Sequence, residues 1–306
     1  MTLVRRLAVT ALALQMLLVV TGGAVRVTGS GLGCPTWPRC TNDSLANTAA
    51  LGVHGYIEFG NRLLAVLMQV VGVALVLAVR RVPHPRSWTR LALLQATVVP
   101  LQAVIGGLLV LSGLNPYVLI LHFLASFPLI YGAAALLRRV LDTERPAPRP
   151  VPPHLHLLSG ALVLSAATAL VLGTLVTGTG PHAGDPKVHR LPFDPRSVTQ
   201  LHADAVFVLV GLTLAAVLLA WRTPFRRWTL VLAGLLLAQG SIGYWQYFTS
   251  VPPLLVGMHV AGATLVFTTA AWLRVSTRAD APQRRTAVPL PERAAGTATA
   301  PSPPAR

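Results

Sequence analysis

Four polar side chains stand near the starts of long apolar runs, where a polar group costs free energy unless it has a partner or a function. They are Asn61, His122, His202 and His259. Imidazoles that project from facing helices at one depth can bind an iron porphyrin from both sides. The pattern therefore predicts a heme held between His202 and His259. For any single histidine, hydrogen bonding to a neighbouring helix is the alternative.

A polar stripe begins the second apolar run, in the sequence "HGYIEFGNR". Glu58 and Arg62 are four residues apart and share a helix face with Asn61, so they form either an ion pair or a surface that meets a ligand's polar edge or propionates and handles a proton. Arg26 ends the first run. It could bind a carboxylate of a cofactor or extend its charge to the membrane interface.

Two cysteines, Cys34 and Cys40, lie in the short segment "GCPTWPRC". Pro35 and Pro38 restrict the backbone between them, so a disulfide there could be strained and reducible. A structural crosslink and a redox-active dithiol are both compatible with this pattern.

The elements that carry these residues are membrane helices. The chain has 306 residues, of which 53% are hydrophobic and 11% charged, with a mean hydropathy of +0.62. Runs of about 20 apolar residues match the hydrocarbon thickness of a bilayer. We expect an all-α membrane protein with eight transmembrane helices near residues 7–27, 55–79, 90–112, 117–137, 156–178, 200–221, 228–248 and 253–273. The first run resembles a signal peptide but lacks a small-residue cleavage site, so we expect it to be retained.

The net charge of +16 comes from arginines that crowd alternate loops and both termini. By the positive-inside rule these segments are cytoplasmic, which places the protein in the cell membrane with both termini inside and the cysteine loop outside. An extracytoplasmic loop can hold a disulfide. The distribution of charge argues against a nucleic-acid partner.

An internal repeat relates the two halves of the chain. "VTGSG" (27–31) matches "VTGTG" (176–180), and a glutamine precedes a histidine by 20 residues twice, as Gln102 with His122 and as Gln239 with His259. The same comparison pairs Asn61 with His202. We therefore expect two pseudo-symmetric four-helix bundles, an N-terminal half over 1–140 and a C-terminal half over 141–275, followed by a disordered cytoplasmic tail over 276–306.

The motifs "VTGGAVRVTGSGLGCPTWPRC", "HGYIEFGNR", "LHFLAS", "QLHADAV" and "GMHVAGATL" resemble the heme A synthase family of cytochrome oxidase assembly, in the Gram-positive and actinobacterial branch that has a cysteine pair in its first outer loop. The resemblance covers about residues 5 to 275. It implies eight helices in two halves and an oxidoreductase that converts the C8 methyl group of heme O to a formyl group. The product, heme A, is destined for cytochrome c oxidase.

The resemblance also implies roles for individual residues. Heme b lies between His202 and His259, and the substrate heme O binds the N-terminal half through His122. The family's glutamate and arginine correspond to Glu58 and Arg62. Its cysteine pair corresponds to Cys34 and Cys40, which would pass reducing equivalents or help heme transfer, while Glu58 would handle a proton.

The sequence departs from the family pattern at Asn61, where the motif E-x-x-H-R has a histidine. Asparagine is a poor iron ligand, so the substrate iron would have His122 alone, with an axial position open to oxygen. The alternative is a di-heme cytochrome that transfers electrons from quinol. The departure argues against it, because efficient electron transfer prefers two low-spin hemes and the N-terminal half lacks a second histidine ligand. The expected partners are heme O, heme O synthase, other components of oxidase assembly, membrane lipid and further copies of the chain.

Overall fold

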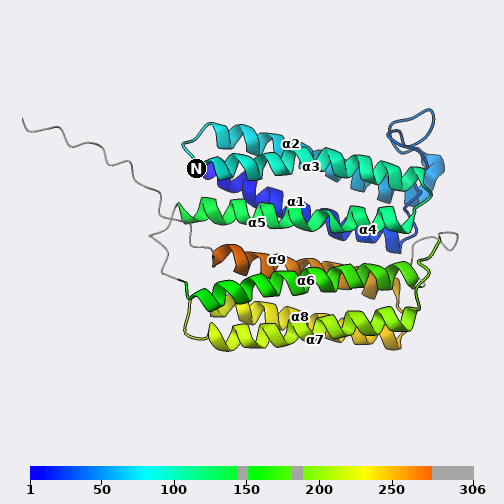
Figure 1. Ribbon diagram of the computed structural model, residues 1–306. Helices are drawn as coiled ribbons and strands as arrows, with labels where there is room; N and C mark the ends of the chain where they lie inside the picture. Colours follow the sequence, from blue (N-terminus) through cyan, green and yellow to red (C-terminus); the bar gives the residue numbers. More distant parts are fainter. Residues whose placement is uncertain (144–150, 181–188, 278–306) are drawn as a thin grey trace, which may run out of the picture.

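The computed structural model describes residues 1–143, 151–180 and 189–277, and within these ranges it contains helices and no strand (Figure 1). The helices are α1 (Thr2–Val27), the short 3₁₀-helix η1 (Ala49–Leu51), α2 (Gly52–Arg80), α3 (Arg86–Leu111), α4 (Pro116–Leu124), α5 (Ser126–Asp142), α6 (Pro153–Thr179), α7 (Pro195–Leu219), α8 (Arg226–Phe248) and α9 (Pro253–Ser276). Because α4 and α5 together form one span, eight spans are long and apolar enough to cross a membrane. The predicted all-α, eight-span membrane protein is confirmed.

The spans pack as two rings of four (Figure 1). In the N-terminal half α1 contacts α2, α2 contacts α3, α3 contacts α5, and α5 returns to α1. In the C-terminal half α6, α7, α8 and α9 close a second ring in the same order, and α9 also contacts α1 and α5. The division into two pseudo-symmetric halves over 1–140 and 141–275 stays a prediction. Nearly all of the predicted tail, from residue 278 onward, lies outside the described residues.

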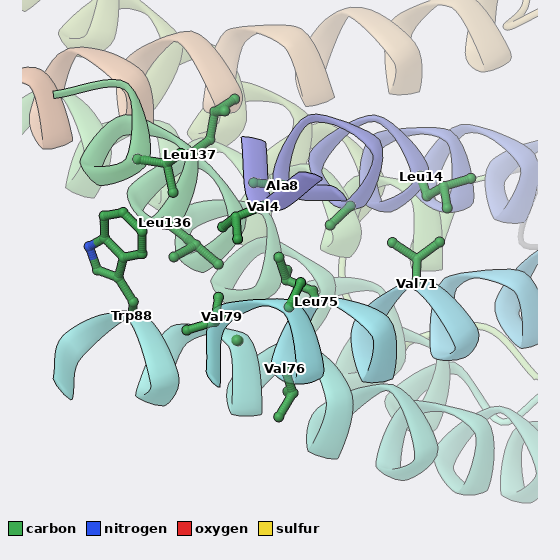
Figure 2. Close-up of a cluster of buried hydrophobic side chains, with 14 of the residues drawn as sticks. Val4, Ala8, Leu14, Val71, Leu75, Val76, Val79, Trp88, Leu136 and Leu137 are labelled. Carbon is green, nitrogen blue, oxygen red and sulfur yellow. The ribbon is translucent and has the colours of Figure 1, made fainter. Parts of the chain in front are cut away.

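The two ends of the bundle differ in what fills them. We call the end at which α1 is joined to α2 the loop end, and the end at which α1 begins and α9 finishes the terminal end. Near the terminal end, apolar side chains such as Val4, Leu75, Trp88 and Leu136 pack into a core (Figure 2). In α2 this core begins at Met68, about 10 Å along the helix from Asn61. Packing therefore holds the bundle together away from the predicted site.

Two helix starts set the positions of His122 and His202. The Asn115 side chain accepts a hydrogen bond from the Tyr117 amide at the start of α4, and Asp194 accepts from the Ser197 amide (2.8 Å) at the start of α7. Each cap is followed by a proline at the first helical position, which favours the start. The Ser197 hydroxyl and amide lower the pKa of Asp194, so the cap carries a negative charge at the positive end of α7.

A proline inside α3 creates a polar contact between helices. Pro100 has no N–H to donate to the carbonyl of Ala96, four residues earlier. That carbonyl accepts instead from Gln69 Nε2 of α2, at 3.1 Å. The helices are close here, because a Cβ added to Gly72 would lie 3.3 Å from the Ala96 Cα. In lipid such a bond replaces the water that a soluble protein would use.

We expect Gln69→Met to destabilise the chain by about 1 kcal/mol, because Ala96 loses the donor that replaces its backbone partner. Thermal unfolding in detergent would measure the loss. In a Pro100→Ala background the α-helical N–H returns, so the same substitution should cost less. An equal cost in both backgrounds would show that the Gln69 bond is independent of the proline.

Candidate functional site

His202 and His259 face each other in the C-terminal half. Their ring centroids are 6.5 Å apart, with an angle of 68° between the ring planes. The rings come from α7 and α9, which occupy opposite corners of the four-helix ring, so the two side chains meet inside it. The structure brings together the pair that the sequence predicted as axial ligands.

The separation of this pair fits two imidazoles on opposite sides of an iron porphyrin. Two metal–nitrogen bonds of about 2 Å plus half a ring on each side span roughly 6 Å between ring centres, which is close to the observed separation. His202 Nδ1 lies 3.0 Å from the Ala169 carbonyl, so the Nδ1–H tautomer leaves Nε2 as the metal-binding atom. Within the described residues no three His, Cys, Asp or Glu side chains are grouped as a metal site. A pair of imidazoles therefore suits a metal that brings its own further ligands, as in heme.

Glycines make room for these rings. A Cβ added to Gly173 of α6 would lie 3.2 Å from Cε1 of His202, and one added to Gly243 of α8 would lie 3.6 Å from Cε1 of His259. In the N-terminal half, Gly106 of α3 has the same relation to His122, at 3.2 Å. Each histidine thus lies against a neighbouring helix at a glycine.

The N-terminal half offers one imidazole and one amide. His122 projects from α4, and Asn61 lies on α2 at the opposite corner of the ring. The Thr21 hydroxyl of α1 donates to Asn61 Oδ1 at 2.7 Å, so this amide is tied to its neighbouring helix. The structure thus places His122 and Asn61 on helices at opposite corners of the N-terminal ring.

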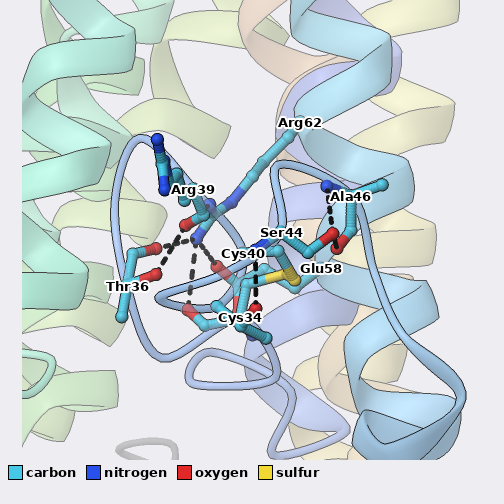
Figure 3. Close-up of a disulfide and its surroundings, with 9 residues drawn as sticks. Cys34, Thr36, Arg39, Cys40, Ser44, Ala46, Glu58 and Arg62 are labelled. Atoms are coloured by element: carbon cyan, nitrogen blue, oxygen red, sulfur yellow. Dashed lines mark hydrogen bonds and ion pairs between the residues drawn. A yellow bond between two sulfur atoms is a disulfide. The ribbon is translucent and has the colours of Figure 1, made fainter.

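Glu58 and Arg62 hold the cysteine loop against α2 (Figure 3). The Glu58 side chain is buried, and its Oε2 accepts from the Cys34 amide at 2.6 Å while its Oε1 accepts from Arg62. Arg62 also donates to the carbonyls of Cys34 (3.2 Å), Thr36 (3.1 Å) and Arg39 (3.2 Å). The ion pair that the spacing suggested is present. The sequence did not indicate that this ion pair also fixes the loop, because no local pattern links Glu58 to a segment more than 20 residues away.

Cys34 and Cys40 form a disulfide, and both residues are fully buried. The loop lies directly on the helices at two glycines. A Cβ on Gly33 would come within 2.2 Å of the His54 carbonyl oxygen of α2, and a Cβ on Gly107 would come within 2.4 Å of the Trp37 ring. The loop therefore covers α2 and α3 at the loop end. Gly107, against which Trp37 lies, is next in sequence to Gly106, against which His122 lies.

Arg26 and His54 make contacts that sequence reasoning did not identify. Arg26 Nη2 donates to the Thr177 carbonyl of α6 at 3.3 Å, which links the two halves of the chain. His54 is exposed, and its Nδ1 lies 2.9 Å from the Ser30 hydroxyl. At the loop end, Ser30 of "VTGSG" is thus the partner of His54, and Thr177 of "VTGTG" is the partner of Arg26.

Comparison with known proteins places this arrangement in a family. A family model described as cytochrome oxidase assembly protein matches residues 5–184, which is more than half of the chain. The chain belongs to this family. The matched residues include Glu58, Asn61, His122 and both cysteines, whereas His202 and His259 lie beyond them.

Several curated relatives are named heme A synthase. The chain is 34% identical to that of Bacillus licheniformis over 134 residues, which is 43% of each chain. It is 35% identical to that of Geobacillus kaustophilus over 134 residues, covering 43% of this chain and 41% of the relative. For Lysinibacillus sphaericus the identity is 35% over 119 residues, or 38% of each chain. The chain thus matches less than half of the length of these relatives.

We expect Glu58→Leu to release the cysteine loop, because the buried Cys34 amide loses its acceptor and Arg62 loses the carboxylate that orients it. Amide hydrogen exchange of residues 34–40 should accelerate roughly tenfold or more, since a hydrogen bond to a charged group contributes about 1.5–3 kcal/mol. Glu58→Gln, which keeps one acceptor oxygen, should have a smaller effect.

The matched control is Arg138→Leu, which breaks another i,i+4 ion pair of the described residues, Arg138 with Asp142, near the terminal end. It should leave exchange in the loop unchanged. Equal exchange in Glu58→Leu and the unaltered chain would refute the docking role of Glu58.

Proposed function

We propose that this chain is a heme A synthase that oxidises the C8 methyl group of heme O to a formyl group. Its family membership and the name of its relatives support this activity. The observation that carries it is the facing pair of imidazoles in one half, 6.5 Å apart, with a single imidazole at the corresponding place in the other half. One half is then suited to a permanent cofactor and the other to a substrate.

His202 and His259 are proposed to hold heme b, with His202 oriented by the Ala169 carbonyl. When bound, this heme supplies one-electron transfer. Written with water as the formal oxygen source, the conversion of methyl to formyl releases four electrons and four protons, so an acceptor for electrons and one for protons are both needed. The pair of neutral imidazoles would provide for the electron acceptor, because it would retain a redox group within the membrane.

The N-terminal half is proposed to bind heme O through His122, with its C8 methyl group near Glu58. Asn61 leaves the second axial position without a strong ligand and is itself held by Thr21. Glu58 is proposed to accept a proton, while Arg62 and Arg26 bring positive charge to the loop end, where propionates carry negative charge. The buried disulfide of Cys34 and Cys40 is proposed either to pass reducing equivalents, by accepting two electrons and two protons as it becomes a dithiol, or to help heme transfer.

The chain is proposed to lie in the cell membrane with both termini cytoplasmic and the cysteine loop outside, as the arginine distribution indicates. Heme O synthase is the proposed source of substrate, and oxidase assembly is the proposed destination of the product.

Expression with a source of heme O, followed by extraction of hemes and mass analysis, tests the activity. We expect heme A in addition to heme b, loss of heme A in His122→Ala, and a marked decrease in Glu58→Gln. His202→Ala should lose heme b. Finding only heme b and unconverted heme O in the unaltered chain would refute the proposal and leave the electron-carrier alternative.

Asn61→His tests the open axial position. The substitution places a second imidazole opposite His122, so we expect the substrate iron to change from high-spin to low-spin in absorption and paramagnetic resonance spectra. Asn61→Ala is the control and should remain high-spin. A low-spin substrate heme in the unaltered chain would show that another group already occupies that position.

A further inference from the structure

Two buried glutamines make the same contact in the two halves. Gln102 Nε2 of α3 donates to the His122 carbonyl at 3.0 Å, and Gln239 Nε2 of α8 donates to the His259 carbonyl at 2.9 Å. Both side chains are buried, with 9% and 8% exposure. Each bond joins a histidine to the helix that precedes it. Two different stretches of sequence arrive at one arrangement, which indicates a requirement rather than a local accident of packing.

Each of these pairs also contains two buried polar atoms without a partner in the described part of the chain. They are Oε1 of the glutamine and Nδ1 of the histidine, in both halves. An imidazole that binds a metal through Nε2 carries a hydrogen on Nδ1 and is a donor there, whereas an amide Oε1 is an acceptor. Each pair therefore has one unused donor and one unused acceptor, and an unpaired buried polar atom is costly.

The imidazoles lie along the helix faces that carry the glutamines. Gly106 and Gly243 each follow their glutamine by four residues, which places them on the same face one turn further on. These are the glycines whose added Cβ would contact Cε1 of His122 and His259. Gly262 lets the Gln239 side chain lie against α9, because a Cβ on Gly262 would come within 2.2 Å of Oε1.

We propose that Gln102 and Gln239 are positioning residues for the imidazoles that bind iron. In each, Nε2 fixes the backbone carbonyl of the histidine. Its Oε1 accepts from the histidine Nδ1–H through one bridging water molecule, since the two atoms make no direct bond. Metal-binding histidines almost always donate their second N–H to an acceptor, which orients the ring and raises its basicity. His202 already has such an acceptor in Ala169, so Gln239 supplies the equivalent for the opposite ligand.

The inference rests on the proposed binding of heme by these histidines, and the resident heme b gives a measurement independent of heme A formation. A more basic imidazole stabilises oxidised iron. Gln239→Met, which is similar in size but has no acceptor, should raise the midpoint potential of heme b, shift its low-spin paramagnetic signal and weaken heme retention by about 10–100-fold. Gln239→Glu keeps an acceptor oxygen and should not raise the potential.

Gln95→Met is the matched control. Gln95 is a fully buried glutamine that donates to the Leu129 carbonyl at 3.0 Å and accepts from Gln15, with no histidine involved. Its substitution should lower stability without changing the potential of heme b. Gln102→Met should likewise leave that potential unchanged but weaken binding of heme O about tenfold or more.

If Gln239→Met does not accumulate as a folded protein, Gln239→Asn tests the same bond, because the shorter amide cannot reach and should also raise the potential. A potential and a paramagnetic signal equal to those of the unaltered chain, in whichever of these two variants folds, would overturn the inference. An equal shift in Gln95→Met would overturn it too. Absence of a heme that depends on His202 and His259 would instead contradict the proposed function itself.

Discussion

Hydrocarbon offers no hydrogen bonds, so every polar group inside this bundle must find its partner within the protein, and the structure depends on that constraint. Gln69 donates to the carbonyl that Pro100 leaves unpaired, and Gln95 joins Gln15 of α1 to the backbone of α5. Such bonds have definite directions, unlike apolar contacts between helices. The Leu129 carbonyl lies seven residues, about two turns, beyond His122, so its bond to Gln95 helps to fix the rotation of that span and the direction in which the imidazole projects.

The same constraint explains why the two ends of the bundle differ. At the terminal end, apolar side chains from α1, α2, α3 and α5 fill the space between helices without any polar cost. At the loop end polar groups are concentrated, and Glu58 and Arg62 are paired with each other and with the cysteine loop. Glu58 would be an isolated buried carboxylate if the Cys34 amide and Arg62 did not face it. The loop is thus part of what makes a carboxylate tolerable beside the predicted substrate site, in addition to covering the helices.

Most of the fold could be predicted from the sequence, because hydropathy indicates where each membrane span lies and the repeat indicates which spans belong together. Sequence reasoning also predicted that His202 and His259 meet, since equal depth and facing helices follow from position along the chain. It did not predict the docking of Glu58 and Arg62 onto the loop, because these contacts join segments that no period relates. It also did not predict the bond from Arg26 to Thr177, because the repeat relates these two segments without saying that they touch. The 20-residue spacing of Gln102 and His122 was visible as a repeat, but only the structure gives it a physical meaning as a hydrogen bond to a carbonyl.

The repeat is most informative where the halves differ. Counting from the paired glutamines, Gln95 and Pro100 of α3 correspond to Leu232 and Leu237 of α8. The bond from glutamine to the histidine carbonyl is retained in both halves, whereas the internal proline, the glutamine pair and the disulfide loop belong to the N-terminal half alone among the described residues. A permanent cofactor needs only a closed apolar ring with two ligands. Under the proposed function, a substrate that must enter, react and leave needs an open ligand position and polar groups beside it. Asn61 and Glu58 are the residues proposed to provide them in the N-terminal half.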